Sequence, residues 1–289
     1  MTRSGTPVLS LGEIAYANCL PIQEPFRERW EREYRFTTRE PADINRLLRA
    51  GEVDCAPASS IEYAHHPDLY WIVPDLSIGA DGPARSVVLM TPVPVAELDG
   101  QEIYLTPASA TSVVLLKILL EQVAGVHPCY VEGVPGDPHL PHLLIGDHAM
   151  RRFYDPPPGI DVVDLGSWWK EVTDLPMVFA LWLLRREAAA REPAASRQLA
   201  ARLGRMRHEM DAARLAALAN RFAGREFSAD RLLAYWHTLS YALTDRHRAG
   251  LARFYELARE TGAVDQVPSL DLYPEAEVPL PATGSASGP

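Results

Sequence analysis

Residues 101–120, QEIYLTPASATSVVLLKILL, constrain the fold of this chain more than any other segment. Residues 101–105 form a short run with β-branched and aromatic side chains, typical of a strand, and Pro107 interrupts it. A small polar turn at residues 109–112 then leads into an apolar run of helical length at residues 113–120. The segment predicts a strand, a polar turn and a helix in direct succession.

The turn carries three hydroxyl groups, on Ser109, Thr111 and Ser112. They fall in the first helical turn, where free backbone N–H groups and the positive end of the helix dipole favour an anion such as a carboxylate or phosphate. The same hydroxyls also suit a helix cap without any ligand, and this segment alone favours the cap. The interpretation as an anion site depends on similar turns elsewhere in the chain.

The composition limits the class of protein. A chain of 289 residues with 47% hydrophobic residues can bury the core of two domains or of one large domain. The 28 basic and 38 acidic residues give a net charge of −10, which argues against nucleic acid or an anionic membrane as the main partner. Cys19, Cys55 and Cys129 are widely spaced, so they indicate neither a disulfide framework nor a zinc site, and they favour a reducing compartment.

The chain shows no membrane or export signal. Residues 1–21 lack a continuous apolar core of signal-peptide length. The most apolar stretch, residues 177–184, stops at Arg185, well short of the roughly 20 residues that a membrane helix needs. We therefore expect a soluble, cytoplasmic protein.

Strand-like and helical segments alternate along most of the chain. Pro25 is expected to begin the first helix, residues 166–169 to form a loop, and residues 187–262 to be helical with interruptions. Strands are expected at residues 8–16, 34–38, 53–56, 71–73, 85–90, 101–105, 129–131, 143–145 and 160–165. This alternation predicts an α/β fold with a largely parallel sheet.

Two features suggest that the chain crosses between two lobes. Pro92 and Pro94 mark a first break, and the apolar run at residues 177–184 returns the chain. We predict a larger lobe from residues 1–91 and 180–273, which carries the C-terminal helices, and a smaller lobe from residues 92–179. Residues 274–289, rich in Pro, Ala, Gly and Ser, are expected to be a flexible tail.

Polar side chains follow four predicted strands. Asn18, the pair Ser59 and Ser60, the turn at 109–112 and Asp147 each come directly after a strand, two on each side of the first crossing. Ligands of open α/β sheets bind at the carboxyl ends of strands, so these turns describe a cleft between two domains. Asp147 ends an apolar strand, and ligand contact and a structural hydrogen bond are equally good explanations for it.

Other chemical motifs are weak. His139, His142 and His148 lack the spacing of a zinc site, so no metal is expected. Cys19 favours a packed thiol over a nucleophile. The chain has no nucleotide-binding or serine-hydrolase motif.

Taken together, these residues resemble the chorismate dehydratases that open the futalosine route to menaquinone. The matching segments run in family order from about residue 9 to residue 186, and the ordered set is more specific than any member: residues 12–21, 51–54, 59–63, 74–78, Gly82, 86–89, 109–112, 145–147, 164–166, Trp169 and 175–176. The C-terminal helices carry no matching motif. The pattern Tyr16-x-Asn18-x-x-Pro21 with Ser59-Ser60 favours this family over its sister in the same pathway, which makes a dihydroxynaphthoate.

The resemblance implies a type II periplasmic-binding-protein fold used as an enzyme. It implies loss of water from chorismate to give 3-[(1-carboxyvinyl)oxy]benzoate, without metal or organic cofactor, and an active-site role for Asn18. The competing hypotheses are the sister enzyme and a non-catalytic solute-binding module for a small carboxylate. The oligomeric state stays open.

The chemistry of that reaction does not require a metal, a cofactor or a strong protein base in the site. Because loss of the C4 hydroxyl and the C3 proton creates an aromatic ring, the enzyme mainly has to orient the substrate and assist proton transfer. We expect Ser59, Ser60, Ser86, Ser109, Thr111 and Ser112 to bind the substrate, with the helix N-termini at Ser59–Ser60 and at 109–112 each taking a carboxylate. The substrate's enolpyruvyl carboxylate is the expected base, with Asn18 positioning the hydroxyl and Asp147 as the rival base.

Overall fold

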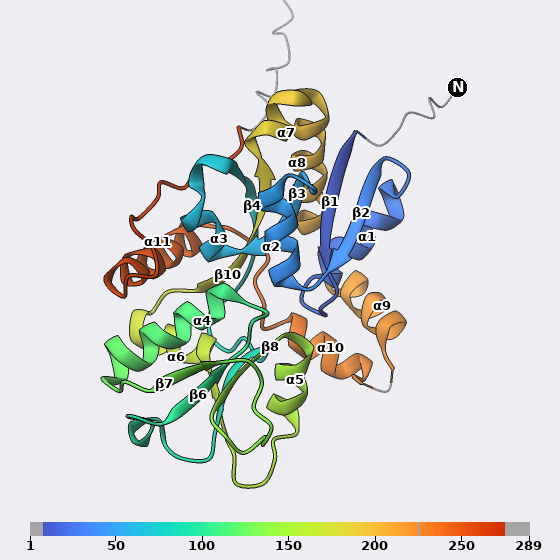
Figure 1. Cartoon of the computed structure of the whole chain (residues 1–289). Coiled ribbons are helices and arrows are strands. Elements are labelled where there is room, and N and C mark those ends of the chain that lie inside the picture. The colour runs from blue at the N-terminus through green and yellow to red at the C-terminus, as the bar shows by residue number, and fades with distance from the viewer. Residues whose placement is uncertain (1–7, 225, 275–289) are drawn as a thin grey trace, which may run out of the picture.

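The computed structural model describes residues 8–224 and 226–274 and shows two α/β lobes, each built on a five-stranded sheet (Figure 1). The sheet of the larger lobe has the order β2-β1-β3-β10-β4, and that of the smaller lobe has the order β7-β6-β8-β5-β9. The predicted two-lobed fold is confirmed. Residues 275–289, most of the predicted tail, lie outside the described residues.

The larger lobe contains strands β1 (Leu9–Ile14), β2 (Tyr34–Arg39), β3 (Cys55–Ser59), β4 (Tyr70–Ala80) and β10 (Met177–Arg185). Its helices are α1 (Leu20–Trp30), α2 (Pro41–Ala50), α3 (Ser60–His65), α7 (Arg186–Arg191), α8 (Pro193–His208) and α11 (Asp245–Glu260), with the short η1 (Pro67–Leu69). Helices α9 (Ala212–Phe222) and α10 (Ala229–Trp236) lie beside the junction of the lobes (Figure 1).

The smaller lobe contains strands β5 (Val87–Thr91), β6 (Glu102–Leu105), β7 (Cys129–Glu132), β8 (His142–Ile145) and β9 (Asp161–Asp164). Its helices are α4 (Ala110–Lys117), which continues into the π-helix η3 (Ile118–Ala124), then α5 (Gly146–Tyr154) and α6 (Leu165–Thr173), with the short η2 (Val95–Glu97). The strand, turn and helix predicted at residues 101–120 are β6, its turn and α4.

Each sheet contains one antiparallel strand, and that strand is the first one that the chain forms after it passes from one lobe to the other. β10 runs antiparallel to β3 and β4, and β5 runs antiparallel to β8 and β9, whereas β1, β2 and β3 are parallel. The first crossing therefore lies between β4 and β5, before residue 87, and not at Pro92. Pro92 and Pro94 interrupt the chain only after β5, and residues 87–91, predicted in the larger lobe, pair within the sheet of the smaller lobe.

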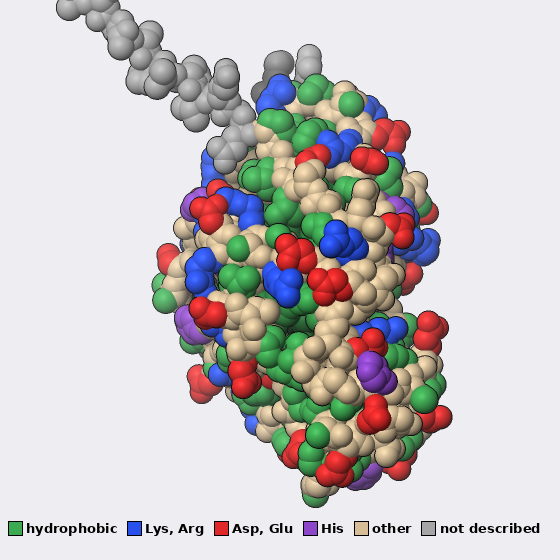
Figure 2. Space-filling view, turned by 90° about the vertical axis from the view of Figure 1, so that its left-hand side faces the viewer, with side chains coloured by type: hydrophobic (Ala, Val, Ile, Leu, Met, Phe, Trp, Pro, Cys, Tyr) green, Lys and Arg blue, Asp and Glu red, His purple; other side chains and the backbone are tan. Residues whose placement is uncertain are grey.

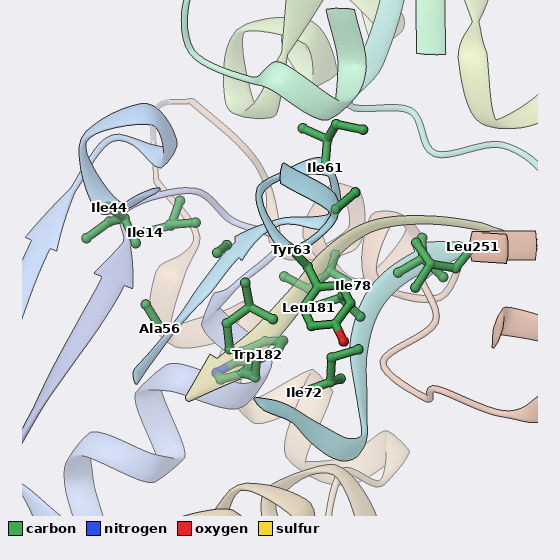
Figure 3. Close-up of a cluster of buried hydrophobic side chains, with 14 of the residues drawn as sticks. Ile14, Ile44, Ala56, Ile61, Tyr63, Ile72, Ile78, Leu181, Trp182 and Leu251 are labelled. Carbon is green, nitrogen blue, oxygen red and sulfur yellow. The ribbon is translucent and has the colours of Figure 1, made fainter. Parts of the chain in front are cut away.

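The core of the larger lobe packs between its sheet and its helices. Figure 3 shows Ile72, Ile78 and Leu181 close together, with Tyr63 from α3 and Leu251 from α11 beside them. These five side chains are at most 1% exposed. Burying a side chain of this size stabilises the fold by about 1.5–3 kcal/mol, so the core fixes the sheet against α3 and α11.

Three local predictions were wrong. The first helix begins at Leu20 with Pro21 in its first turn, and Pro25 lies inside it. The strand predicted at residues 71–73 is the much longer β4, which continues through Pro74 and Asp75, a residue with positive φ. A register shift in its pairing with β10 accommodates these two residues. Residues 166–169 are helical in α6, because the Asp164 carboxylate accepts a hydrogen bond from the Ser167 N–H at 2.9 Å and caps the helix.

Helix α11 lies close to the second crossing. A Cβ atom on Gly250 would sit 2.0 Å from the carbonyl oxygen of Pro176, which directly precedes β10. Such a distance is far inside van der Waals contact, so glycine allows this approach. Within the described residues, no helix is both long and apolar enough to span a membrane.

We expect Gly250→Ala to lower the free energy of unfolding by about 1–3 kcal/mol, because the methyl group would push α11 off the crossing. Gly204→Ala in α8 is the matched control: it has open space around its Cβ position and should stabilise the protein by up to about 1 kcal/mol. Urea unfolding measures both variants. Equal gains in stability for the two variants would contradict the close packing.

Candidate functional site

The site is a narrow cleft between the lobes. Its lining comes from the ends of β1, β3 and β8, the beginnings of β5 and β10, and the turn before α4. Antiparallel β5 and β10 present their amino ends where the parallel strands present their carboxyl ends, so these six segments meet at one place. Pro41, Ile78 and Leu239 complete the lining. The predicted residues that line it are Asn18, Ser59, Ser86, Ser109 and Ser112.

Asn18 lies in the turn after β1. Its side-chain oxygen is buried and has no hydrogen-bond partner among the described residues. Its backbone carbonyl accepts a hydrogen bond from the Tyr241 hydroxyl at 2.8 Å, which fixes the position of the turn. A buried acceptor without a partner costs about 1–3 kcal/mol, so this amide is poised for a ligand.

Ser86, directly before β5, is held by α10. The Tyr235 hydroxyl donates to Ser86 Oγ at 2.8 Å, and Ser86 Oγ donates to the Ala84 carbonyl over a longer 3.3 Å. Burial raises the pKa of Tyr235, so its hydroxyl stays protonated and is a fixed donor. Ser86 therefore keeps a single hydrogen, which the Ala84 carbonyl holds only over 3.3 Å, so a stronger acceptor in the cleft can take it in place of that carbonyl.

The turn before α4 presents two serines. Ser109 Oγ caps the helix by accepting from the Ser112 N–H at 3.3 Å and lies 2.9 Å from Ser112 Oγ. Opposite, the Ser59 N–H donates to Asn45 Oδ1 at 3.1 Å, which anchors the end of β3. Helix N-termini from both lobes thus point hydroxyls and dipoles toward the same space.

Ser60 and Thr111 do not belong to the described lining of the cleft. Thr111 Oγ1 accepts from the Ile61 N–H at 3.1 Å and lies 3.3 Å from Ser60 Oγ, with both residues fully buried. These two hydroxyls join α3 to α4 across the lobes. Their predicted role in substrate binding stays a prediction, and their observed contacts are structural.

Asp147 also joins the lobes. Its carboxylate accepts a hydrogen bond from the Ala17 N–H at 2.9 Å, so α5 of the smaller lobe holds the turn that carries Asn18. Burial raises the pKa of Asp147, against the lowering effect of that hydrogen bond. Gly146, which precedes Asp147, has φ +61°, and a Cβ there would lie 2.6 Å from the Tyr16 ring.

The described cleft residues include no carboxylate, histidine, lysine or arginine. Its titratable members are Tyr16 and Cys19, and burial raises the pKa of both. Both therefore stay protonated at neutral pH and cannot serve as bases. Elsewhere, no three His, Cys, Asp or Glu side chains of the described chain gather into a group that could hold a metal ion.

Sequence reasoning missed the contribution of the C-terminal helices. Tyr235 contacts Ser86, Tyr241 contacts Asn18, and the Trp236 indole donates to the Ala17 carbonyl at 2.8 Å. The adjacent aromatic residues Tyr235 and Trp236 indicate a buried helix face. Nothing in the local sequence indicates that they contact residues of the cleft, which lie more than 140 positions earlier in the chain.

The fold belongs to the class of two-lobed binding proteins. The structure resembles AF1704 from Archaeoglobus fulgidus (TM-score 0.62, 19% identity, 89% of this chain and 98% of the other). It also resembles the periplasmic aliphatic sulphonate binding protein SsuA from Escherichia coli (TM-score 0.61, 14% identity, 94% of each chain). At these identities the similarity concerns the fold.

The sequence comparisons identify the family. The model of a family described as menaquinone biosynthesis matches residues 9–260. A chorismate dehydratase from Thermus thermophilus is 35% identical over 195 residues, which cover 61% of this chain and 70% of the relative. The chain belongs to the chorismate dehydratase family of menaquinone biosynthesis.

Asp147→Asn tests the inter-lobe hydrogen bond, because it keeps an acceptor oxygen and removes the buried charge. The pKa of Asp147 is higher in the folded protein than in the unfolded chain, so ionising this carboxyl group destabilises the fold. This destabilisation is absent below the ordinary aspartate pKa of about 3.9 and grows as pH rises. We therefore expect the variant to gain stability relative to the wild type between pH 4.5 and 7.5, measured by urea unfolding. Asp155→Asn, at the exposed end of α5, should show no such gain, and a pH-independent difference for Asp147→Asn would contradict the argument.

Proposed function

We propose that this protein removes water from chorismate to give 3-[(1-carboxyvinyl)oxy]benzoate in the futalosine route to menaquinone. The observation that carries the proposal is the unpaired, buried amide oxygen of Asn18 in a cleft lined by serine hydroxyls and free of described acidic or basic side chains. Membership of the family and the chorismate dehydratase relative support the choice of substrate.

The cleft fits a reaction whose driving force lies in the product. One C–H bond at C3 and the C–O bond at C4 break, a ring double bond forms, and the proton and hydroxyl leave as water. Because the described lining offers no side chain able to act as a base, the C3 proton goes to the substrate's own enolpyruvyl carboxylate, which passes it to the hydroxyl leaving C4, so that water departs and the carboxylate is regenerated. The Asn18 amide then positions the departing hydroxyl.

Substrate binding requires the lobes to separate. The cleft holds about 60 Å³, space for a few water molecules but not for a ring with two carboxylates. The segment between β4 and β5 and the segment before β10 are the two connections about which the lobes can turn. Closure would then bring the hydroxyls of both lobes onto the substrate.

A purified sample incubated with chorismate tests the reaction. We expect loss of one water in the mass of the product, together with the ultraviolet spectrum of a benzoate. Binding without any change in mass would favour the solute-binding alternative, and no binding would contradict both.

Asn18→Ala tests the role of the amide. We expect kcat to fall about 100-fold while KM changes little, because the contact matters mainly in the transition state. Since no protein base titrates, kcat of the wild type should stay flat with pH above the carboxylate range. Near-complete loss of turnover in Asp147→Asn with an active Asn18→Ala would assign Asp147 as the base instead.

Tyr235→Phe tests whether Tyr235 makes Ser86 a donor toward a substrate carboxylate. Loss of the hydroxyl should raise KM by about 2–10-fold with little change in kcat, because a hydrogen bond contributes about 0.5–1.5 kcal/mol. Tyr63→Phe is the matched control: its hydroxyl donates to the Ser269 carbonyl at 2.7 Å, away from the cleft, and its loss should leave KM unchanged. Equal effects of the two variants would mean that Tyr235 acts through stability alone.

A further inference from the structure

A second cavity opens beside the cleft on the side of the smaller lobe. It encloses about 570 Å³, which is the size of a small-ligand pocket, whereas the cleft encloses about 60 Å³. Its walls are the loop between β7 and β8, the turn after β6, and the faces of β8 and α5, with Tyr16 and Glu40 from the larger lobe. Tyr16 and Ile145 line both spaces, so the cavity adjoins the cleft directly.

The cavity is lined by one arginine side chain that forms no ion pair with the described residues. Arg151 and Arg152 both line it, but Arg151 pairs with Glu226, whereas Arg152 makes no ion pair with any described residue. Glu40 is the one acidic residue of the described lining, and it accepts a hydrogen bond from the Tyr16 hydroxyl. An arginine free in this way is suited to a carboxylate, because its planar group matches the two oxygens.

His142 offers the cavity a hydrogen-bond acceptor, whereas Arg152 offers only donors. Its Nδ1 lies 2.6 Å from the Leu140 carbonyl, which accepts hydrogen bonds and does not donate, so Nδ1 carries the proton and Nε2 is an acceptor. Burial lowers the pKa of His142, and the charge of nearby Arg152 lowers it further, so the ring stays neutral. A neutral imidazole with an acceptor nitrogen suits a ligand hydroxyl and not a ligand carboxylate.

Besides the polar Thr106 and His148, most of the remaining wall is apolar. Val134, Pro135, Pro138, Met90 and Pro157 line the space around Arg152 and His142. Such a surface packs against the faces of a ring. A ring with a carboxylate at one position and a hydroxyl at another therefore matches the cavity in shape and in polarity.

We infer that this cavity is an outer binding site for a cyclic hydroxycarboxylate, with the carboxylate at Arg152 and the hydroxyl at His142, in direct continuity with the cleft. The inference rests on the proposed function, because chorismate belongs to that chemical class. A protein of net charge −10 repels a dianion, and the described surface in Figure 2 shows acidic and basic side chains interspersed. An unpaired arginine beside the cleft gives the substrate a local place of attraction.

Arg152→Gln tests the site, and Arg253→Gln is its matched control, because Arg253 is an exposed arginine on α11 that pairs with Glu256. We expect Arg152→Gln to lower kcat/KM for chorismate about fivefold at low ionic strength through KM, with kcat unchanged. The difference should shrink in 0.5 M salt, because salt screens exposed charges. Arg152→Lys should recover part of the loss, and Arg253→Gln should match the wild type.

Calorimetric titration with 3-hydroxybenzoate gives a readout that does not depend on turnover. We expect Arg152→Gln and His142→Phe to weaken its binding severalfold relative to the wild type and Arg253→Gln. If chorismate turns over but Arg152→Gln equals Arg253→Gln in both measurements, the outer site is wrong and the proposed function stands. If binding depends on Arg152 but chorismate is not dehydrated, the proposed function is wrong and the site stands.

Discussion

The double passage of the chain between the lobes is the constraint on which the rest of the structure depends. Each passage places one antiparallel strand, β5 or β10, in an otherwise parallel set. Their amino ends then lie beside the carboxyl ends of β1, β3, β6 and β8. A simple parallel sheet would offer the cleft one kind of strand end, whereas this topology adds Ser86 and Phe179 from strand beginnings.

The contacts between the lobes use the same kinds of polar group as the cleft. Thr111 reaches the Ile61 N–H, and Asp147 reaches the Ala17 N–H. Helix α10 contacts both sides, because Trp236 bonds to the turn after β1 and Tyr235 bonds to Ser86. These bonds define the arrangement of the lobes around the cleft, so changes in α10 are expected to alter the site without touching a ligand.

Much of the fold could be predicted from the sequence, because alternation of strands and helices is a local signal. The strand before Ser109 ends at residue 105 as predicted, and Asn18 follows its strand, since a polar turn after an apolar run is visible in the sequence. The strand predicted at residues 53–56 runs on to Ser59, because its pairing with β10 extends it. The first crossing was misplaced because pairing of β5 with β8 and β9 depends on residues more than 50 positions away. The same limit applies within the site: Thr111 and Ser109 look equivalent in one turn, and their different contacts depend on α3 across the lobes.

The distribution of charge follows from what the proposed reaction changes. Substrate and product carry the same two carboxylates, so a cation in the cleft would stabilise both equally and would add nothing to the rate of the chemical step. The groups that change in the proposed reaction are the C4 hydroxyl and the C3 hydrogen. A neutral amide at Asn18 beside the C4 hydroxyl would interact differently with the substrate and with the transition state. Under the proposed function and the inferred outer site, neutral donors in the cleft with Arg152 outside it would separate capture of the anion from the chemistry, and the product would leave without breaking a buried ion pair.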